Sequence, residues 1–365
     1  MTETALAQLP GRVQAALRRR RPEARVGELR PLPGGISSLT FSAAVAGAEA
    51  AVAGAEATVA GAGAAVAGAG AAETHVVVKV APPGLAPVRN RDVLRQARVM
   101  AAVHGAAGVH VPAVLAEDGA APPFFVMEFV AGEAYEPTWD ISRDPPAPAV
   151  VDARARAAAR MLARLQAVDP VGVGLGGEPA LSPGEELERW AALYATAGDE
   201  LRGDERALAD ALAARVPEPE PGPARILHGD YRLGNMQFAG ERLAAIIDWE
   251  IWSLGDRRHD IAWLMAFADP VAERVRQRDT PNQAAADAMP SAETLLAVYL
   301  DEAGLSQPPP DLDWFRALAY YKLGATMAVL AKRNRRAAEP DPGLELVAQT
   351  TPPMLERARQ LIGGR

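Results

Sequence analysis

The sequence predicts an α+β protein with a strand-rich N-terminal part and a larger, mainly helical remainder. Two runs rich in β-branched and aromatic residues, 73–80 and 124–130, have the length and composition of buried strands. After residue 150, apolar residues recur at helical spacing in several long segments, of which 153–168 is the first. Residues 136–149, between the two parts, are rich in proline and irregular. We therefore expect one small unit built on a β-sheet and a second unit built from helices.

The composition excludes several classes of function. The chain has 365 residues, enough for two packed units, with 49% hydrophobic residues and a net charge of −8. Because nucleic acids bind to basic surfaces, the acidic balance argues against a nucleic-acid partner. Cysteine is absent, which excludes disulfides, thiolate metal ligands and a cysteine nucleophile. We find no pattern of a signal peptide and no run of about 20 strongly apolar residues, so we expect a cytoplasmic protein without a membrane span.

A low-complexity insertion interrupts the N-terminal part. Residues 44–71 repeat with a period of seven, as AVAGAEA, AVAGAEA, TVAGAGA and AVAGAGA. A seven-residue period is typical of coiled coils, but each glycine costs about 1 kcal/mol in a helix, and alanine and valine bury little area. We interpret the repeat as an insertion in the turn between two strands, which are predicted at 36–42 and 73–80.

Lysine is rare in this chain. Only three of the 38 basic residues are lysines, namely Lys79, Lys322 and Lys332. Lys79 lies near the end of the strand predicted at 73–80 and precedes a helix predicted at 91–103. A lysine at a strand end often does no more than extend its charged head into water. Because arginine is used almost everywhere else, we also consider Lys79 a candidate ligand of phosphate groups.

Four polar residues lie close together in one segment, 224–250, which reads ARILHGDYRLGNMQFAGERLAAIIDWE. They are His228, Asp230, Asn235 and Asp248, and they lie between apolar runs rather than on a solvated face. A lone HGD is most simply a polar loop whose acids cap turns. An aspartate, an asparagine five residues later and a second aspartate after a hairpin are much harder to explain in that way.

The second half of this segment predicts a β-hairpin, with strands at 236–238 and 243–247. The hairpin places Asn235 and Asp248 opposite each other to within a residue or two. Paired residues on adjacent strands lie roughly 4.5–5.5 Å apart. An amide oxygen and a carboxylate at that distance can share one Mg²⁺ ion. Asp230, in the loop before the hairpin, can face the same point as a base.

The C-terminal segments are predicted from their pattern alone. Apolar spacing predicts helices at 291–303, 312–335 and 343–362. Residues 271–290 are polar and are expected to form a loop. Asp256 is expected to cap the helix that runs from there to about residue 268.

The order of the polar residues is that of kinase-type phosphoryl transfer, which uses a catalytic aspartate, an asparagine five residues later and a metal-binding aspartate beyond. HGD stands here where protein kinases have HRD, and DWE where they have DFG. The segment closely resembles the aminoglycoside phosphotransferase-like family, whose catalytic loop reads HGD-x-x-x-x-N. A second family pattern, GD-x-x-x-D-x-A-W, is matched by GDRRHDIAW, which begins at Gly255. The sequences of these motifs are most similar to those of the kinase-like domains associated with acyl-CoA dehydrogenases.

This resemblance implies a protein-kinase-like two-lobe fold and an ATP-dependent phosphotransferase. Residues 1–131 would form the nucleotide-binding N-lobe, a small β-sheet with one helix, and residues 132–365 the catalytic, mainly helical C-lobe. The γ-phosphoryl group of ATP would pass, with Mg²⁺ as cofactor, to a hydroxyl of a small molecule. We consider two acceptors. The similarity to the domains associated with acyl-CoA dehydrogenases suggests a hydroxyacyl-CoA, and an acid-rich cleft expected around Glu250 and Asp256 suggests an aminosugar.

The resemblance also implies roles for individual residues. Asp230 would orient the acceptor hydroxyl and accept its proton, and Arg232 would steady the transferring phosphoryl group. Asn235 and Asp248 would hold Mg²⁺, while Lys79 would pair with the α- and β-phosphates. The remaining assignments concern the turn over the phosphates (Gly34, Gly35, Ser37 and Ser38), the strand end beside the adenine (Glu128 and Val130) and the support of the catalytic loop (His228 and Asp260).

One position departs from the family pattern. The helix after the lysine strand commonly has an acidic partner for the lysine, in a pattern like LLREYRVL. This chain reads VLRQARVM and has Gln96 at that place. A neutral amide can hydrogen-bond Lys79, but charge-assisted hydrogen bonds are about twice as strong. Asp92, one turn earlier on the same face, is an alternative partner with a short side chain.

Two functions from other classes stay open. The departure at Gln96 motivates a catalytically weak nucleotide-binding or interaction protein. His228 and His259, with acids nearby, motivate a metal-dependent phosphohydrolase, although neither HExxH nor closely spaced histidines occur.

Overall fold

The structure is a computed structural model that describes residues 6–32, 38–47, 74–272, 280–341 and 351–363. Its contacts group the chain into two compact units. The first unit contains Met1–Ala134 and Asn235–Trp252, and the second contains Tyr135–Gly234 and Ser253–Arg365. The segment with the predicted hairpin thus belongs to the same unit as the N-terminal sheet, although all of Tyr135–Gly234 separates the two in the sequence.

The first unit is built on an antiparallel sheet. In the described residues it has six strands, in the order β1-β3-β4-β6-β5, with β2 beside β3. They are β1 (Arg25–Val26), β2 (Arg30–Pro31), β3 (Leu39–Ala46), β4 (Thr74–Val80), β5 (Val114–Asp118) and β6 (Phe124–Glu128). β4 lies in the middle of the sheet, and its valine-rich run is buried as predicted. Lys79 on this strand is opposite Thr40 of β3 and Phe125 of β6.

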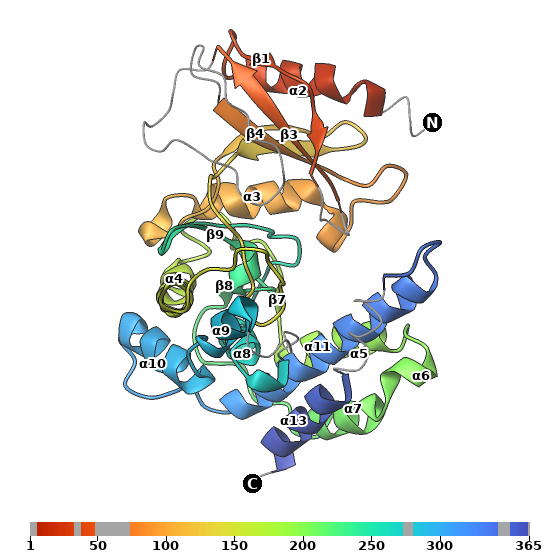
Figure 1. Ribbon diagram of the computed structural model, residues 1–365, viewed down its shortest axis with the longest axis vertical. Coiled ribbons are helices and arrows are strands. Elements are labelled where there is room, and N and C mark those ends of the chain that lie inside the picture. The colour runs from red at the N-terminus through yellow and green to blue at the C-terminus, as the bar shows by residue number, and fades with distance from the viewer. Residues whose placement is uncertain (1–5, 33–37, 48–73, 273–279, 342–350, 364–365) are drawn as a thin grey trace. The chain divides into compact units, whose positions relative to one another are not determined.

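Two helices pack on opposite faces of this sheet (Figure 1). They are α2 (Leu9–Arg18) and α3 (Val93–Val103). Val13 of α2 lies in one hydrophobic core with Val78 and Val80 of β4. Because side chains alternate along a strand, Lys79 lies on the other face of the sheet.

The predicted hairpin is confirmed. β9 (Met236–Ala239) pairs antiparallel with β10 (Arg242–Ile246). Gly240 in the turn has a φ of +61°, which suits a tight hairpin turn. The backbone N–H of Ile247 donates to the carbonyl oxygen of Asn235 at 2.9 Å, which extends the pairing beyond the ends of the two strands.

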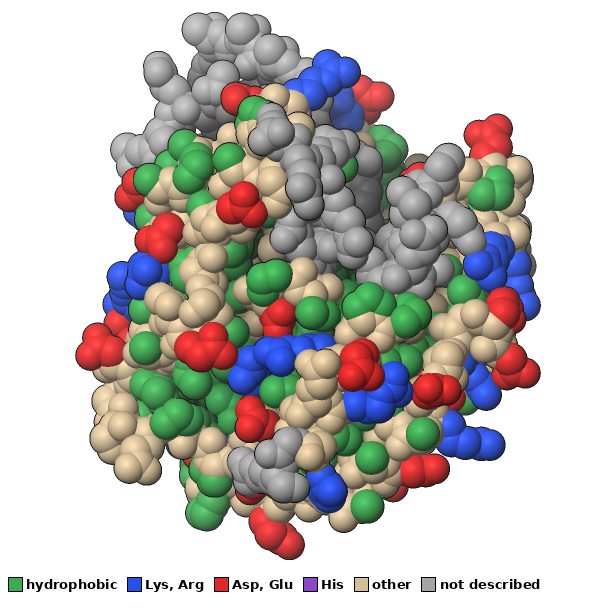
Figure 2. All heavy atoms as spheres, turned by 60° about the horizontal axis from the view of Figure 1, so that its bottom comes forward, with side chains coloured by type: hydrophobic (Ala, Val, Ile, Leu, Met, Phe, Trp, Pro, Cys, Tyr) green, Lys and Arg blue, Asp and Glu red, His purple; other side chains and the backbone are tan. Residues whose placement is uncertain are grey.

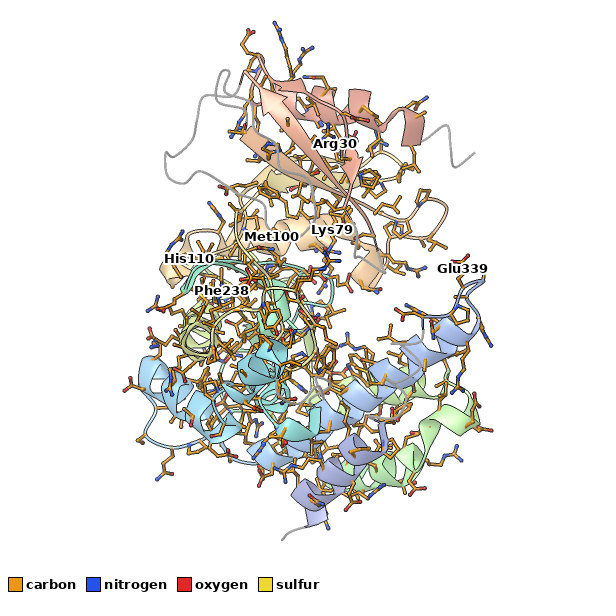
Figure 3. The ribbon with its side chains drawn as sticks, in the orientation of Figure 1. Arg30, Lys79, Met100, His110, Phe238 and Glu339 are labelled. Atoms are coloured by element: carbon orange, nitrogen blue, oxygen red, sulfur yellow. The ribbon has the colours of Figure 1, made fainter. Side chains whose placement is uncertain are left out.

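His110, in the loop before β5, fastens the hairpin to the rest of the first unit (Figure 3). Its carbonyl oxygen accepts a hydrogen bond from Ile246 N at 2.8 Å, and its ring nitrogen Nδ1 lies 3.0 Å from the carbonyl oxygen of Leu243. Glu133 and Phe238 form an additional antiparallel bridge. These contacts fix the hairpin ends, and hence Asn235, relative to the sheet.

The second unit is mainly helical. Its helices are α4 (Pro148–Ala167), α5 (Pro183–Tyr194), α6 (Asp199–Arg202), α7 (Glu205–Ala213), α8 (Arg258–Phe267), α9 (Pro281–Asp287), α10 (Ala292–Ala303), α11 (Leu312–Arg335) and α13 (Thr351–Gly363). A small sheet of β7 (Ala180–Leu181), β11 (Ser253–Gly255) and β8 (Arg225–Leu227) lies beside them. The long helix α11 contacts α5, α8 and α13 and is buried on most of its circumference. A sheet-based unit and a helical unit confirm the predicted α+β class.

Two local predictions are wrong. Part of the expected loop 271–290 is helical, because Thr280 caps α9 by accepting a hydrogen bond from Gln283 N. Asp256 does not cap α8, which begins at Arg258. The Asp256 carboxylate instead binds the Arg258 guanidinium and its backbone N–H.

The surface shows mixed charge. On the face drawn in Figure 2, acidic and basic side chains are interspersed among apolar ones over the described residues. This mixture suits the moderate net charge of −8. Within the described ranges, none of the helices is long and apolar enough to span a membrane.

Candidate active site

Lys79 and Asp248 form an ion pair in the first unit. Nζ of Lys79 on β4 lies 2.6 Å from Oδ1 of Asp248, which follows β10. The lysine side chain is 9% exposed and the aspartate side chain 40% exposed. The lysine of this pair is thus buried, whereas the carboxylate is accessible to water.

The backbone at Asp248 has an unusual conformation that its neighbours hold. Its φ is +65°, in the left-handed region that residues other than glycine rarely adopt, at a cost of order 1–3 kcal/mol. The Trp249 indole N–H donates to the carbonyl oxygen of Ile246 at 3.1 Å. The guanidinium of Arg95 on α3 lies 4.0 Å from the ring centroid of Trp252 and donates to that residue's carbonyl oxygen. The segment after Asp248 is therefore held against α3.

Asn235 and Asp248 provide a donor set that fits Mg²⁺. Asn235 is buried, and its pairing with Ile247 places it one residue out of register with Asp248. Lys79 contacts only one carboxylate oxygen of Asp248, and the other has no partner among the described residues. An amide oxygen and a carboxylate oxygen are the ligand types that Mg²⁺ prefers.

Gln96 does not replace the missing acid. It is buried on α3, and its amide Nε2 donates to the carbonyl oxygen of Asn90 at 3.2 Å. The described partner of Lys79 is Asp248, so the hydrogen bond considered between Gln96 and Lys79 is not formed. Asp92 is not a partner either, because its carboxylate accepts from Arg95 N and caps α3.

The other residues expected at the nucleotide are only partly described. Gly34, Gly35 and Ser37 lie outside the described residues, as does most of the repeat at 44–71. Ser38 is buried, and its Oγ has no hydrogen-bond partner in the part of the chain that the structure describes. A buried hydroxyl without a partner suits a phosphate oxygen as acceptor. Glu128 ends β6 on the surface, and Val130 lies two residues further along the chain.

In the second unit, Asp260 holds the loop that begins at His228. Its Oδ2 accepts from His228 N at 2.7 Å and its Oδ1 from Gly229 N at 3.0 Å. Burial raises the pKa of the Asp260 carboxyl, although His228 and the two backbone donors act in the opposite direction. Gly229 has a φ of +86°, which explains a glycine between His228 and Asp230. The backbone N–H of Asp230 donates to Nδ1 of His228 at 3.3 Å.

Both oxygens of the Asp230 carboxylate accept a hydrogen bond. Trp263 Nε1 on α8 donates to Oδ1 at 2.9 Å, and Arg232 Nε donates to Oδ2 at 3.4 Å. These contacts hold the carboxylate in one orientation. Trp263 was not among the predicted site residues. It is the last residue of GDRRHDIAW, so its place in the motif was its only signal in the sequence.

Glu136 is a second residue that the sequence did not single out. It is fully buried, its Oε2 accepts from Gly234 N at 3.1 Å, and it lies 3.8 Å from Nη1 of Arg232. Burial raises the pKa of Glu136 to about 7, against the opposing effect of the Arg232 guanidinium. A Cβ at Gly234 would lie 2.1 Å from Nη1 of Arg232, so any larger residue there would displace the guanidinium from this position. Glu136 and Gly234 thus set the position of the Arg232 side chain.

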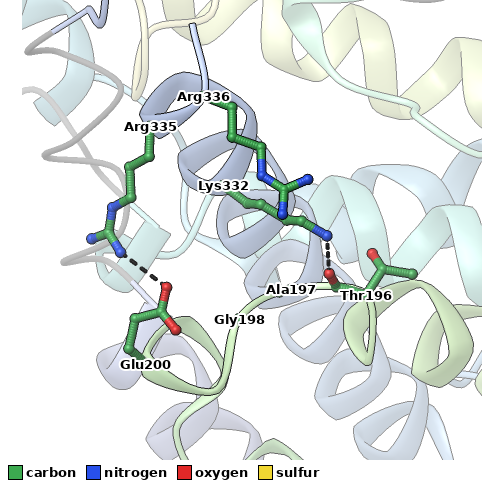
Figure 4. A pocket seen from close by; sticks show the side chains of 7 residues that line it. All are labelled: Thr196, Ala197, Gly198, Glu200, Lys332, Arg335 and Arg336. Carbon is green, nitrogen blue, oxygen red and sulfur yellow. Dashed lines mark hydrogen bonds and ion pairs between the residues drawn. The ribbon is translucent and has the colours of Figure 1, made fainter.

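A pocket of about 260 Å³ in the second unit includes none of these residues (Figure 4). It is lined by Thr196, Ala197, Gly198, Glu200, Lys332, Arg335 and Arg336. Arg335 pairs with Glu200 at 3.3 Å, and the Lys332 ammonium donates to the carbonyl oxygen of Thr196. Cations at the end of α11 are also favoured by the negative end of the helix dipole. Its basic residues thus have a structural explanation apart from the candidate site.

Sequence comparison places the chain among phosphotransferases. The profile of the phosphotransferase enzyme family, APH, matches residues 61–295. Acyl-CoA dehydrogenase family member 11 of Gallus gallus is 29% identical over 249 residues, which are 65% of this chain and 31% of that protein. The chain spans between 24% and 37% of the length of the curated relatives that it matches.

Solved structures confirm the kinase-like fold. A candidate aminoglycoside phosphotransferase from Ralstonia eutropha has a TM-score of 0.69 at 21% identity, with 93% of each chain covered. A thermostable mutant of aminoglycoside phosphotransferase APH(4)-Ia, in complex with AMP-PNP and hygromycin B, has a TM-score of 0.54 at 13% identity, with 96% of this chain and 97% of that chain covered. Because the family profile extends over more than half of the sequence, the chain belongs to the phosphotransferase enzyme family.

Proposed function

We propose that this protein transfers the γ-phosphoryl group of ATP to a hydroxyl of a small molecule, with Mg²⁺ as cofactor. The observation that carries the proposal is the pair of Lys79 and Asp248, with Asn235 one residue out of register. A buried cation beside two oxygen ligands is what a metal-bound nucleotide needs. Membership of the phosphotransferase enzyme family supports the reaction class.

The residues of the first unit would bind the nucleotide. Lys79 would exchange its contact with Asp248 for the α- and β-phosphates, while Asn235 and Asp248 hold Mg²⁺. When bound, the ion neutralises charge on the phosphate oxygens. The remaining proposed contacts are the turn at Gly34, Gly35, Ser37 and Ser38 over the phosphates and the chain at Glu128 and Val130 beside the adenine.

Residues of the second unit would act on the acceptor. Asp230, five residues before Asn235 in the chain, orients the hydroxyl and accepts its proton, and Trp263 and Arg232 hold its carboxylate in place. Arg232 steadies the transferring phosphoryl group with its guanidinium, which lies 3.8 Å from the Glu136 carboxyl. His228 and Asp260 fix the backbone of the loop.

For the acceptor we propose a hydroxyacyl-CoA. The support is the similarity to Acyl-CoA dehydrogenase family member 11, a protein of which this chain spans less than a third. The expected acidic cleft for an aminosugar has less support, since both oxygens of Asp256 are bound by Arg258 and one also accepts from Glu220 N. The charge of the Asp256 carboxylate is already paired with the Arg258 guanidinium, so it is not available to bind an ammonium group.

A screen of ATP consumption over hydroxyacyl-CoAs, aminosugars and other hydroxylated metabolites tests the proposal. We expect turnover that requires Mg²⁺ and one class of acceptor. Asp230→Asn should lower kcat by about 10²–10⁴-fold, because it removes the base, while the thermal shift with Mg-ATP is retained. Near-wild-type turnover by Asp230→Asn on a confirmed acceptor would refute the assigned base.

A thermal shift with Mg-ATP and a colorimetric phosphate assay on monoesters separate the two alternatives. A thermal shift with Mg-ATP but no ATP turnover on any acceptor would indicate a nucleotide-binding protein without catalysis. Release of phosphate from monoesters without a nucleotide would indicate a metal-dependent phosphohydrolase.

A further inference from the structure

Lys322 of α11 is buried between two tryptophan rings. Its ammonium lies 4.9 Å from the ring centroid of Trp263 and 5.1 Å from that of Trp190. It also donates a hydrogen bond to Oε1 of Glu186 on α5 at 3.0 Å. A buried cation on a ring face attracts the ring, so Lys322 restricts how both indoles can turn. Phe267 contacts Trp263 as well, with ring centroids 5.6 Å apart.

The two indoles have different hydrogen-bond acceptors. Trp190 Nε1 donates to Oε1 of Glu186 at 2.9 Å, within the same buried cluster as Lys322. Trp263 Nε1 donates at 2.9 Å to Oδ1 of Asp230, outside that cluster. The N–H of Trp190 therefore binds within the buried ion pair, whereas the N–H of Trp263 connects this cluster to the proposed base.

From this difference we infer that Trp263 is a positioning residue of the reaction, which holds the Asp230 carboxylate in the orientation that accepts the hydroxyl proton. The inference rests on the proposed function, because it concerns the base named there. A tryptophan that only fills the core needs some acceptor for its N–H. Here the acceptor is the proposed base, and the rigid ring fixes the direction in which Oδ1 accepts.

A fixed carboxylate matters because misplacement of a reacting group slows a reaction steeply. The contact of Arg232 Nε with Asp230, at 3.4 Å, is longer than that of Trp263 Nε1, so it orients the carboxylate less strictly than Trp263 does. Without the indole N–H, Oδ1 loses this contact and the carboxylate is oriented less strictly. We expect the loss in the rate of transfer rather than in the binding of ATP.

Trp263→Phe and Trp190→Phe form a matched pair of variants. Each change removes one indole N–H and keeps an aromatic ring beside Lys322. Steady-state kinetics use Mg-ATP and the acceptor with the highest turnover in the screen. Trp263→Phe should lower kcat by about tenfold to a hundredfold, with the KM for ATP changed by less than about threefold. Trp190→Phe should leave kcat within about threefold of the wild type, although it lowers stability.

The indole N–H resonances of ¹⁵N-tryptophan-labelled protein provide a second readout that needs no ligand. Trp263→Phe identifies the signal of Trp263. In Asp230→Asn that signal should move upfield, because a neutral acceptor replaces a charged one, while the signal of Trp190 stays. An unmoved Trp263 signal would contradict the hydrogen bond itself.

The outcomes separate this inference from the proposed function. If the wild type turns over no acceptor, the proposed function fails and the inference fails with it. If the wild type is active but the two tryptophan variants have equal kcat, the base assignment stands and the positioning role of Trp263 is refuted. A selective fall in kcat for Trp263→Phe supports both.

Discussion

Two lysine–carboxylate pairs of this chain, Lys79–Asp248 and Lys322–Glu186, have similar contact distances and very different surroundings. Lys79 lies 2.6 Å from Asp248, and Lys322 lies 3.0 Å from Glu186. The Asp248 side chain is 40% exposed, whereas that of Glu186 is 7% exposed. Since lysine is rare in the chain, neither position is a generic choice of cation.

The carboxylate of Glu186 has several partners besides its lysine. Arg189 lies 2.7 Å from one of its oxygens, and Trp190 donates to the other. Burial alone would raise the pKa of Glu186, but Lys322 and Arg189 outweigh it and lower that pKa strongly. Asp248 has one described ion-pair partner and a backbone φ of +65°. A buried pair with several charged and polar neighbours stabilises the fold, whereas an exposed, strained pair can exchange its partner for a ligand.

Replacing the buried lysine, Lys322, with methionine tests whether the Lys322–Glu186 pair stabilises the fold. Lys322→Met should lower the free energy of unfolding by about 3–5 kcal/mol, because Glu186 keeps a buried charge without its main counter-ion. Urea unfolding followed by circular dichroism measures the effect. A loss below about 1 kcal/mol would mean that the pair contributes little to the fold.

A double variant is the control for that result. Lys322→Met combined with Glu186→Gln removes both charges and keeps an acceptor for the Trp190 N–H. It should recover part of the stability lost in Lys322→Met. No recovery would place the cost in the contacts of the lysine with the two rings instead.

Glu136 is an acid between these two extremes, buried like Glu186 but 3.8 Å from its cation Arg232. Burial raises its pKa to about 7, above the ordinary value of 4.5, so the folded state retains this proton where the unfolded state has lost it. The stability contributed by Glu136 is therefore highest below about pH 4.5 and falls as the pH rises to about 7. Glu136→Gln mimics the protonated form and should not show this pH-dependent loss of stability.

The difference in unfolding free energy between Glu136→Gln and the wild type should accordingly grow by about 2–3 kcal/mol from pH 5 to pH 8. Urea unfolding at both values measures it, with every other titration common to the two proteins. A difference that does not change with pH would show that Glu136 is ionised throughout this range, as Glu186 is expected to be.

The hairpin at Asn235 and Asp248 was predictable because its determinants are local. Alternating apolar residues and a glycine turn set the two strands, and the register then follows within one residue. The buried strand with Lys79 was predictable for the same reason. The partner of Lys79 was not, since Asp248 lies 169 residues away and the sequence offered only Gln96 and Asp92 nearby.

Trp263 and Glu136 could not be assigned because their roles depend on tertiary contacts. Trp263 matches a family pattern, yet which acceptor its N–H reaches is decided by the packing of α8 against the loop of Asp230. Glu136 stands in a proline-rich stretch whose pattern predicts only an irregular chain. Asp256 was misassigned because a helix cap and a partner of Arg258 look alike in sequence.

Lys79→Met tests the other half of the comparison and should have the smallest effect on stability. We expect the free energy of unfolding to fall by about 1 kcal/mol or less, because Asp248 can be hydrated once its lysine is gone. Phosphoryl transfer should nevertheless fall by about 10²–10³-fold, since a cation aimed at the phosphates is lost. Lys79→Arg is the matched control, which keeps the charge but differs in the geometry of its donors, so it should retain stability and recover only part of the activity. If Lys79→Met instead destabilises the protein as much as Lys322→Met does, the pair is structural, and the proposal that Lys79 leaves Asp248 for a nucleotide loses its main support.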